Sequence, residues 1–113
     1  MTLAEIVKKL NLTVKTGAEL LERDVKGGYV SDLMSDVMAN ANEADLWVTL
    51  QIHQNIVAVA VMKSLAGIVL INGREPETET VEKATAEGLP IMVTDMPAFE
   101  LVGRLFAMGI SGS

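Results

Sequence analysis

The stretch that decides the fold runs from residue 46 to residue 71 and reads LWVTLQIHQNIVAVAVMKSLAGIVLI. Its first five residues, 46–50, are apolar or β-branched and are typical of a strand. Its last five, 67–71, form a continuous apolar run, which is typical of a strand buried on both faces. Two such strands with a long connection between them predict a βαβ unit, in which the strands are parallel.

The connection itself contains an ambiguous segment, IVAVAVM at residues 56–62. The alternation of β-branched residues would suit a strand, but two parallel neighbours need a crossover, and no other part of the connection can supply one. We therefore predict a helix from residue 56 to residue 65, capped by Asn55. Since this helix is apolar nearly all round, we expect it to be sandwiched inside the protein or to face another subunit.

The same alternation of helices and strands extends to both sides of this unit. Before it, the pattern predicts a helix over 3–10 with a Thr2–Glu5 capping box, short strands over 11–15 and 27–30, and a helix from Ser31 or Asp32 to about Ala41. After it, the pattern predicts a helix between Pro76 and Gly88, a strand over 90–94 and a last helix after Pro97. We interpret residues 1–113 as one α/β domain with a mostly parallel sheet of about five strands, whose order is left open.

Composition excludes several classes of function. The net charge of −6 and the lack of a lysine or arginine stripe argue against nucleic acid or an anionic membrane as the main partner. The chain has no cysteine, so a disulfide framework, a thiolate nucleophile and a cysteine metal site are all excluded. The first ten residues do not have the charge order of a signal peptide, and no apolar run is long enough to span a membrane, so we expect a cytoplasmic protein.

Polar residues follow the predicted strands where each of them ends. In open parallel sheets, ligands bind outside the carboxyl ends of the strands, near helix N-termini that favour anions. Arg74 could hold a phosphate or carboxylate through two hydrogen bonds, and His53 could donate to the same group. The predicted ligand-binding residues are Ser31, Asp32, Gln51, His53, Asn72, Gly73, Arg74 and Thr94.

A purely structural interpretation of these residues stays open. Ser31, Asp32 and Thr94 are of the types that cap helices without any ligand, and Asn72-Gly73 is an ordinary turn dipeptide. The acidic residues between Glu75 and Glu87 are typical of a solvated helix face and are too loosely spaced for a metal site, so we expect neither a metal nor a cofactor.

Sequence motifs of common catalytic sites are absent. The chain contains no G-x-x-x-x-G-K-[ST], no G-x-G-x-x-G, no G-x-S-x-G and no histidine pair. A Ser-His-Asp assembly would have to use His53, and no serine is marked as its nucleophile. We therefore assign no catalytic residue.

Three segments carry a resemblance to a known family. Residues 21–38 (LERDVKGGYVSDLMSDVM), 49–57 (TLQIHQNIV) and 71–74 (INGR) resemble the DRTGG domain family. The first segment has Arg23-Asp24 followed by Val25-Lys26-Gly27-Gly28 in place of the letters of the family's name. The resemblance extends over essentially the whole chain.

The resemblance implies a fold and a role. DRTGG domains are similar to the N-terminal domain of HPr kinase/phosphorylase, which implies a three-layer α/β/α fold. They also occur in phosphotransacetylases and beside CBS domains in inorganic pyrophosphatases, where they are regulatory, subunit-contact modules. Stand-alone versions are sometimes described as serine kinases, but this chain lacks the phosphate-binding loop that such an activity needs.

From these observations we expect a non-catalytic regulatory module that self-associates as a homodimer and binds a small anionic ligand such as a nucleotide. The apolar helix over 56–62 and the seven methionines favour self-association, because methionine suits adaptable contact surfaces. Two alternatives stay open. One is a protein-interaction subunit of a separately encoded enzyme, and the other is a phosphate-transfer enzyme that uses His53 and Arg74.

Overall fold

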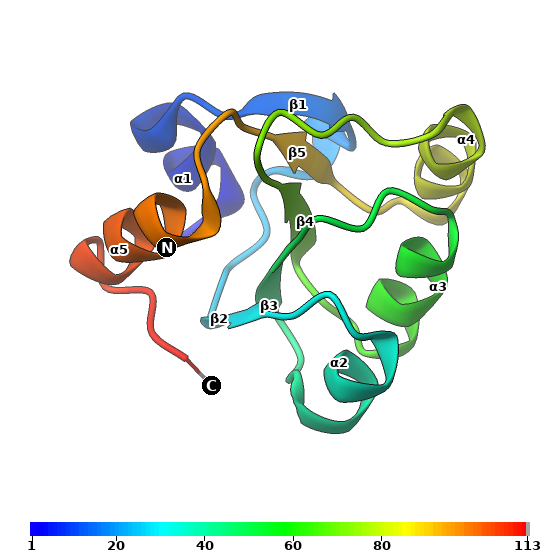
Figure 1. Cartoon of the computed structure of the whole chain (residues 1–113). Coiled ribbons are helices and arrows are strands. Elements are labelled where there is room, and N and C mark those ends of the chain that lie inside the picture. The colour runs from blue at the N-terminus through cyan, green and yellow to red at the C-terminus, as the bar shows by residue number, and fades with distance from the viewer. Residues whose placement is uncertain (113) are drawn as a thin grey trace.

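A computed structural model describes residues 1–112. Five strands form one mixed sheet in the order β1-β5-β4-β3-β2, with β1 antiparallel to β5 and the other neighbours parallel (Figure 1). The strands are β1 (Thr13–Thr16), β2 (Gly27–Val30), β3 (Asp45–Thr49), β4 (Gly67–Leu70) and β5 (Ile91–Val93). The mostly parallel five-stranded sheet is the α/β architecture that the sequence predicted.

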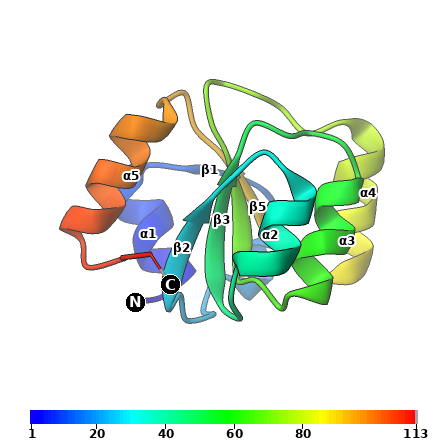
Figure 2. The same ribbon diagram turned by 60° about the horizontal axis from the view of Figure 1, so that its bottom comes forward.

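Helices cover both faces of the sheet and complete a three-layer α/β/α fold (Figure 2). The crossover helices α2 (Met34–Asn40), α3 (Asn55–Met62) and α4 (Thr78–Glu87) lie on one face. Each of them joins two adjacent parallel strands in the same direction along the sheet, and right-handed crossovers therefore place all of them on the same side. Helices α1 (Leu3–Leu10) and α5 (Ala98–Ala107) cover the opposite face, and a short 3₁₀ turn, η1 (Ala18–Leu20), follows β1.

The central strands are buried on both faces and divide the core into two clusters. Along β3, Leu46 and Val48 pack with α1 and α5, whereas Trp47 packs with α2 and α3. Trp47 is fully buried, and its indole Nε1 donates to the carbonyl of Ser31 at 2.8 Å. This two-sided burial explains why the decisive sequence runs are continuously apolar rather than alternating.

The ambiguous segment 56–62 is helical, as predicted, and it is largely enclosed. Helix α3 packs between α2 and α4, and it buries Ile56, Val57, Val59 and Ala60. Packing between α2 and α4 accounts for these four apolar residues, whereas Val61 and Met62 are 42% and 69% exposed at the end of the helix.

Helix α1 begins with the predicted capping box, but two other predicted caps are wrong. Helix α2 begins three residues after Ser31 with Leu33 at its N-cap, and it receives no side-chain cap because Asp32 bonds to β3 and its loop instead. Asn55 is the first residue of α3, and its N–H donates to Nδ1 of His53.

The two edges of the sheet differ. The position of β1 beside β5 settles the strand order that the sequence left open. At the other edge, Gly28 of β2 donates its N–H to the carbonyl of Ser111 at 3.0 Å, and Gly28 pairs with Gly112, so the last described residues cover part of that edge. None of the described helices has the length and apolarity that crossing a membrane requires.

Candidate functional site

A crevice lies at the carboxyl ends of β4 and β5. The chain leaves β4 toward α4 on one face, and it leaves β5 toward α5 on the other face (Figure 1). Connections that diverge to opposite faces leave space between the carboxyl ends of two parallel strands, which is where open α/β sheets bind ligands. Because β1 is antiparallel to β5, its first residues lie beside the carboxyl end of β5 and form a wall of the crevice.

A pocket of about 510 Å³ occupies this crevice, and we call it the β4–β5 pocket. Its volume falls in the range of about 300–1,000 Å³ that is common for small-molecule sites. The pocket is lined by residues from α1, β1, the ends of β4 and β5, and α5: Leu10, Asn11, Thr13, Lys15, Gly73, Glu75, Val93, Thr94, Asp95, Met96 and Arg104.

Backbone hydrogen bonds hold the floor of the pocket together. The N–H of Asn72 donates to the carbonyl of Met96 at 3.0 Å, and the N–H of Gly73 donates to the carbonyl of Thr94 at 2.9 Å. Asn72 and Gly73 both have positive φ, at 56° and 69°, as their turn dipeptide predicts. A Cβ on Gly73 would lie 3.1 Å from Oδ1 of Asp95, so glycine permits this close approach between the two loops.

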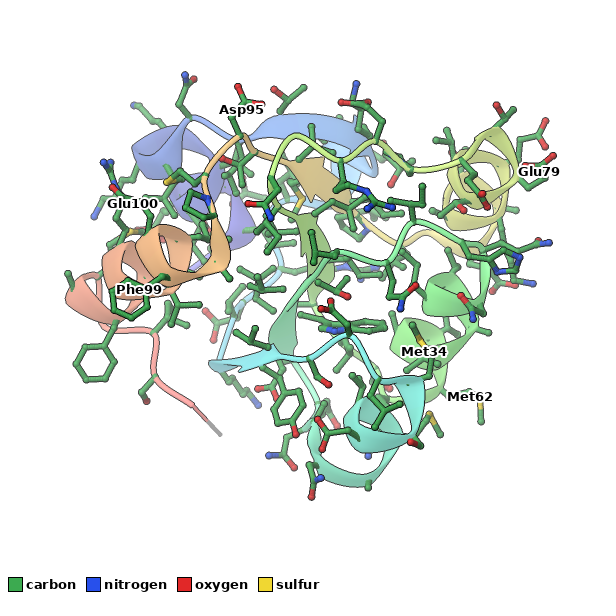
Figure 3. All side chains as sticks on the ribbon, viewed as in Figure 1. Met34, Met62, Glu79, Asp95, Phe99 and Glu100 are labelled. Atoms are coloured by element: carbon green, nitrogen blue, oxygen red, sulfur yellow. The ribbon has the colours of Figure 1, made fainter. Side chains whose placement is uncertain are left out.

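The charges of the pocket are balanced by ion pairs. Nζ of Lys15 on β1 lies 2.7 Å from Oε1 of Glu75, in the loop after β4. The Arg104 guanidinium lies 2.9 Å from Oε1 of Glu100, one turn earlier on α5. Asp95 stands exposed at the end of β5 (Figure 3). An anion entering the pocket would therefore meet two cations that carboxylates already neutralise.

Of the predicted ligand-binding residues, Gly73 and Thr94 line this pocket. The hydroxyl of Thr94 accepts from the N–H of Met96 at 3.2 Å, so it stabilises the loop after β5. Asn72 and Arg74 flank Gly73 in the same turn, and the N–H of Arg74 donates to the carbonyl of Ile71. Among residues 1–112, no carboxylate forms an ion pair with the exposed Arg74 guanidinium.

Ser31, Asp32 and Gln51 gather at the ends of β2 and β3, where they tie two loops together. Oδ1 of Asp32 accepts from the hydroxyl of Thr49 at 2.8 Å and from the N–H of Leu50 at 2.7 Å. Nε2 of Gln51 donates to the carbonyl of Asp32 at 3.0 Å, and Oγ of Ser31 accepts from the N–H of the residue two positions later. These contacts give all three side chains a structural role.

His53 lies in the loop before α3 and is exposed. Its Nδ1 accepts from the N–H of Asn55 at 3.1 Å, and its carbonyl accepts from the N–H of Ile56. The imidazole therefore closes the first turn of α3, and its Nδ1 is already engaged as an acceptor. No contact that the structure describes joins His53 to Arg74.

Sequence reasoning missed the wall of the pocket that comes from distant elements. Asn11, Thr13, Lys15 and Arg104 belong to β1, the turn before it and α5, and they reach the pocket only through the antiparallel pairing of β1 and the packing of α5. No local pattern marks these residues. Asp95 was available to sequence reasoning, because it directly follows a predicted strand.

In the described part of the chain, no three histidine, aspartate or glutamate side chains gather closely enough to hold a metal ion. The chemistry of the β4–β5 pocket is thus that of hydroxyl, amide, backbone and paired ionic groups, which can bind and orient a polar molecule.

No protein-family model and no curated protein matches the sequence. Among solved structures, the chain is similar to the CBS and DRTGG domains of the regulatory region of Clostridium perfringens pyrophosphatase, in complex with the activator diadenosine tetraphosphate. The two structures agree with a TM-score of 0.70 over 97% of this chain, at 15% sequence identity, and the chain spans 47% of that one. The resemblance to DRTGG domains is therefore confirmed as a likeness of fold.

Proposed function

We propose that this chain is a regulatory module that binds a small phosphorylated ligand, such as a nucleotide, in the β4–β5 pocket. The observation that carries the proposal is the place of the pocket: it lies where connections diverge at the carboxyl ends of parallel strands. The likeness of fold to the regulatory region of a pyrophosphatase, which binds diadenosine tetraphosphate, supports the class of ligand.

Binding of an anion would proceed by exchange of partners. The Lys15 side chain is 33% exposed and already paired with Glu75, so a phosphate would replace the carboxylate at the ammonium group. Glu75 is the more exposed partner and can turn into solvent at little cost, because an exposed ion pair contributes only about 0–1 kcal/mol. Lys15 and Arg104 are the cations that line the pocket. Arg74 lies between the lining residues Gly73 and Glu75, is exposed, and would add a third cation from beside the pocket.

Titration calorimetry of the full chain with inorganic phosphate, nucleoside mono- and triphosphates and diadenosine tetraphosphate tests this function. We expect Lys15→Met and Arg74→Ala each to weaken binding about tenfold or more, as the loss of a charge-assisted contact predicts. Glu75→Gln should tighten binding severalfold, because it removes the competing carboxylate.

Lys63→Met is the matched control, because Lys63 follows α3 and lies at the opposite end of the strands. It should leave the affinity unchanged. If none of the probes binds, or if Lys63→Met weakens binding as much as Lys15→Met, the proposed pocket is wrong.

Self-association is the second part of the proposed function. Its support is the exposure of large apolar side chains on α5, where Phe99 is 94% exposed and Phe106 is 69% exposed. Aromatic groups on a surface are typical of protein contacts rather than of a free face. Light scattering at micromolar concentration should give twice the 12.1 kDa mass of the chain, and a mass of 12.1 kDa alone would reject this part.

The other candidates have less support. A phosphate-transfer enzyme would use His53 as the base, but its Nδ1 accepts a backbone hydrogen bond and no described contact brings it to Arg74. A subunit that contacts a separately encoded enzyme would use the same exposed apolar side chains as self-association. Loss of turnover in His53→Ala, with any phosphorylated substrate, would restore the enzyme as a candidate.

A further inference from the structure

An apolar stripe runs along the outer side of α5. Phe99, Val102, Gly103 and Phe106 follow one another at i, i+3, i+4 and i+7, so they share one face of the helix. Together with Val30 of β2 they line a groove of about 690 Å³. Phe99 lies on the outer side of the helix, away from the sheet (Figure 3). We call Phe99, Val102, Gly103 and Phe106 the α5 stripe.

We propose that the α5 stripe is covered by the α5 stripe of a second copy of this chain, with the two helices antiparallel about a two-fold axis near Val102 and Gly103. This inference rests on the self-association proposed above and names its surface. The core of each chain is closed without the stripe, because Leu101 and Leu105 fill the space between α5 and the sheet.

The pattern of the stripe is self-complementary. An interface with two-fold symmetry requires that residue i contacts residue j of the partner and that j contacts i in return. The order Phe, Val, Gly, Phe has its large residues at both ends and its centre between positions 102 and 103. An antiparallel partner therefore places each Phe99 against Phe106 of the partner subunit and each Val102 against Gly103 of the partner subunit.

Gly103 lets the two helices approach closely at this centre. It lies within α5 and is exposed, and a Cβ built on it would have no atom within 4 Å. Glycine in the middle of a helix costs about 0.5–1 kcal/mol relative to alanine, and no contact within residues 1–112 requires it here. Gly103 leaves a shallow depression on the helix surface between the two aromatic side chains, and Val102 of the partner subunit would fill it.

The ion pair of α5 lies away from the stripe. Glu100 and Arg104 pair with each other at 2.9 Å, and Arg104 lines the β4–β5 pocket on another side of the helix. A contact between two α5 stripes therefore leaves this ion pair and the pocket undisturbed.

The apolar area is sufficient for a specific dimer. A buried aromatic side chain contributes about 150–250 Å², so the phenylalanines of two stripes supply roughly 600–1,000 Å². Specific interfaces begin at about 1,000 Å² in total, and Val30 and Val102 of both copies add to the aromatic area. An unpaired apolar stripe of this size would be an aggregation hazard.

Sedimentation velocity of the full chain at about 1–100 µM tests the surface. We expect the wild type to dimerise, and we expect the double variant Phe99→Ser/Phe106→Ser to dimerise at least about a hundredfold more weakly. Both rings are exposed, so the variant should keep the wild-type circular dichroism spectrum. Met62→Ser is the control, because Met62 on α3 is 69% exposed, like Phe106, and it should dimerise like the wild type.

The outcomes separate the two proposals. A wild type that stays monomeric at every concentration rejects self-association and leaves the groove to a different partner. A wild type that dimerises, with a double variant that dimerises equally well, rejects the α5 stripe alone.

Single cysteines test the direction of the helices, because the natural chain has none. Val102→Cys lies at the proposed axis and should form a disulfide-linked dimer under mild oxidation. Ala107→Cys should not, because the antiparallel arrangement separates its two copies by about nine helical residues, or roughly 13 Å, beyond the reach of a disulfide. Glu79→Cys on α4 is the control for random collision (Figure 3). Equal linking of Val102→Cys and Ala107→Cys, or no linking of Val102→Cys in a dimeric protein, overturns the antiparallel arrangement.

Discussion

Two glycines of this chain share a backbone conformation but differ in their surroundings. Gly17 and Gly88 have φ of 74° and 69°. A Cβ on Gly17 would lie 2.8 Å from Cα of Pro90, whereas the nearest atom to a Cβ on Gly88 is a side-chain carbon of Leu20 at 3.6 Å. We expect Gly88→Ala to lower the free energy of unfolding by about 1 kcal/mol, and Gly17→Ala by roughly 2–4 kcal/mol, because only Gly17→Ala adds a backbone clash. Urea unfolding of both variants checks this, and equal losses would contradict it.

The Tyr29 hydroxyl predicts a dependence of stability on pH. It donates to Oδ2 of Asp36 at 2.8 Å, and this bond, with smaller contributions from Ser31 and Asn40, lowers the pKa of the Asp36 carboxyl. A group with a lowered pKa stabilises the fold above its unfolded pKa, about 3.9 for aspartate, and this contribution is lost as the pH falls through the folded value. The same bond raises the pKa of Tyr29, so its contribution is lost as the pH rises through that raised value.

We therefore expect Tyr29→Phe to be less stable than the wild type at about pH 7, with a difference that shrinks toward about pH 2. Chemical unfolding at both pH values measures the difference. A gap of the same size at both would show that the hydroxyl stabilises the protein without linkage to Asp36.

Among the elements, β1 is held in the sheet by a side-chain hydroxyl as well as by backbone hydrogen bonds to β5. The pairing of β1 with β5 is irregular between Val14 and Thr16. There the buried hydroxyl of Thr16 donates to the carbonyl of Leu89 at 2.7 Å and accepts from the N–H of Ile91 at 2.9 Å. Thr16→Val keeps the shape but leaves two buried backbone groups unpaired, so we expect a loss of roughly 2–4 kcal/mol in the free energy of unfolding. Thr16→Ser keeps the hydroxyl and should lose much less, and similar losses in both variants would contradict the argument.

The pairing of β1 also marks the limit of what the sequence predicts about elements. Periodicity and end signals are local, so the helix over 3–10, the glycine end of α4 and the buried strands β3 and β4 were predictable. The partner and direction of β1 depend on contacts with a strand that lies far away in the sequence, and no local signal carries them. The first residue of a helix was equally uncertain where a polar side chain could bond either to the helix or to a neighbouring segment. Asp32 bonds to β3 and the loop after it and does not cap α2.

The same distinction holds for the candidate site. The sequence predicted that polar residues follow the carboxyl ends of the strands, and the parallel pairing of β2 to β5 brings these ends to the same side of the molecule. It did not distinguish residues that bond to neighbouring loops, such as Gln51, from residues that line a pocket, such as Thr94. That distinction depends on where β1 and α5 lie, which is a property of the whole fold.

At the scale of the whole molecule, the proposed dimerisation through the α5 stripe predicts a thermal stability that depends on concentration. Phe99 and Phe106 are exposed in the single chain and would be buried only in the folded dimer, so mass action would stabilise the dimer as the chain concentration rises. A tenfold rise in concentration adds about 1.4 kcal/mol to the free energy of unfolding of the dimer, which should raise the Tm by roughly 3 °C for a dimer of two such chains. Phe99→Ser/Phe106→Ser should melt at a Tm that does not change with concentration, while Met62→Ser should follow the wild type. Calorimetry over a hundredfold range of concentration measures this, and a wild-type Tm that stays constant would mean that the stripe is not buried between copies when the chain unfolds.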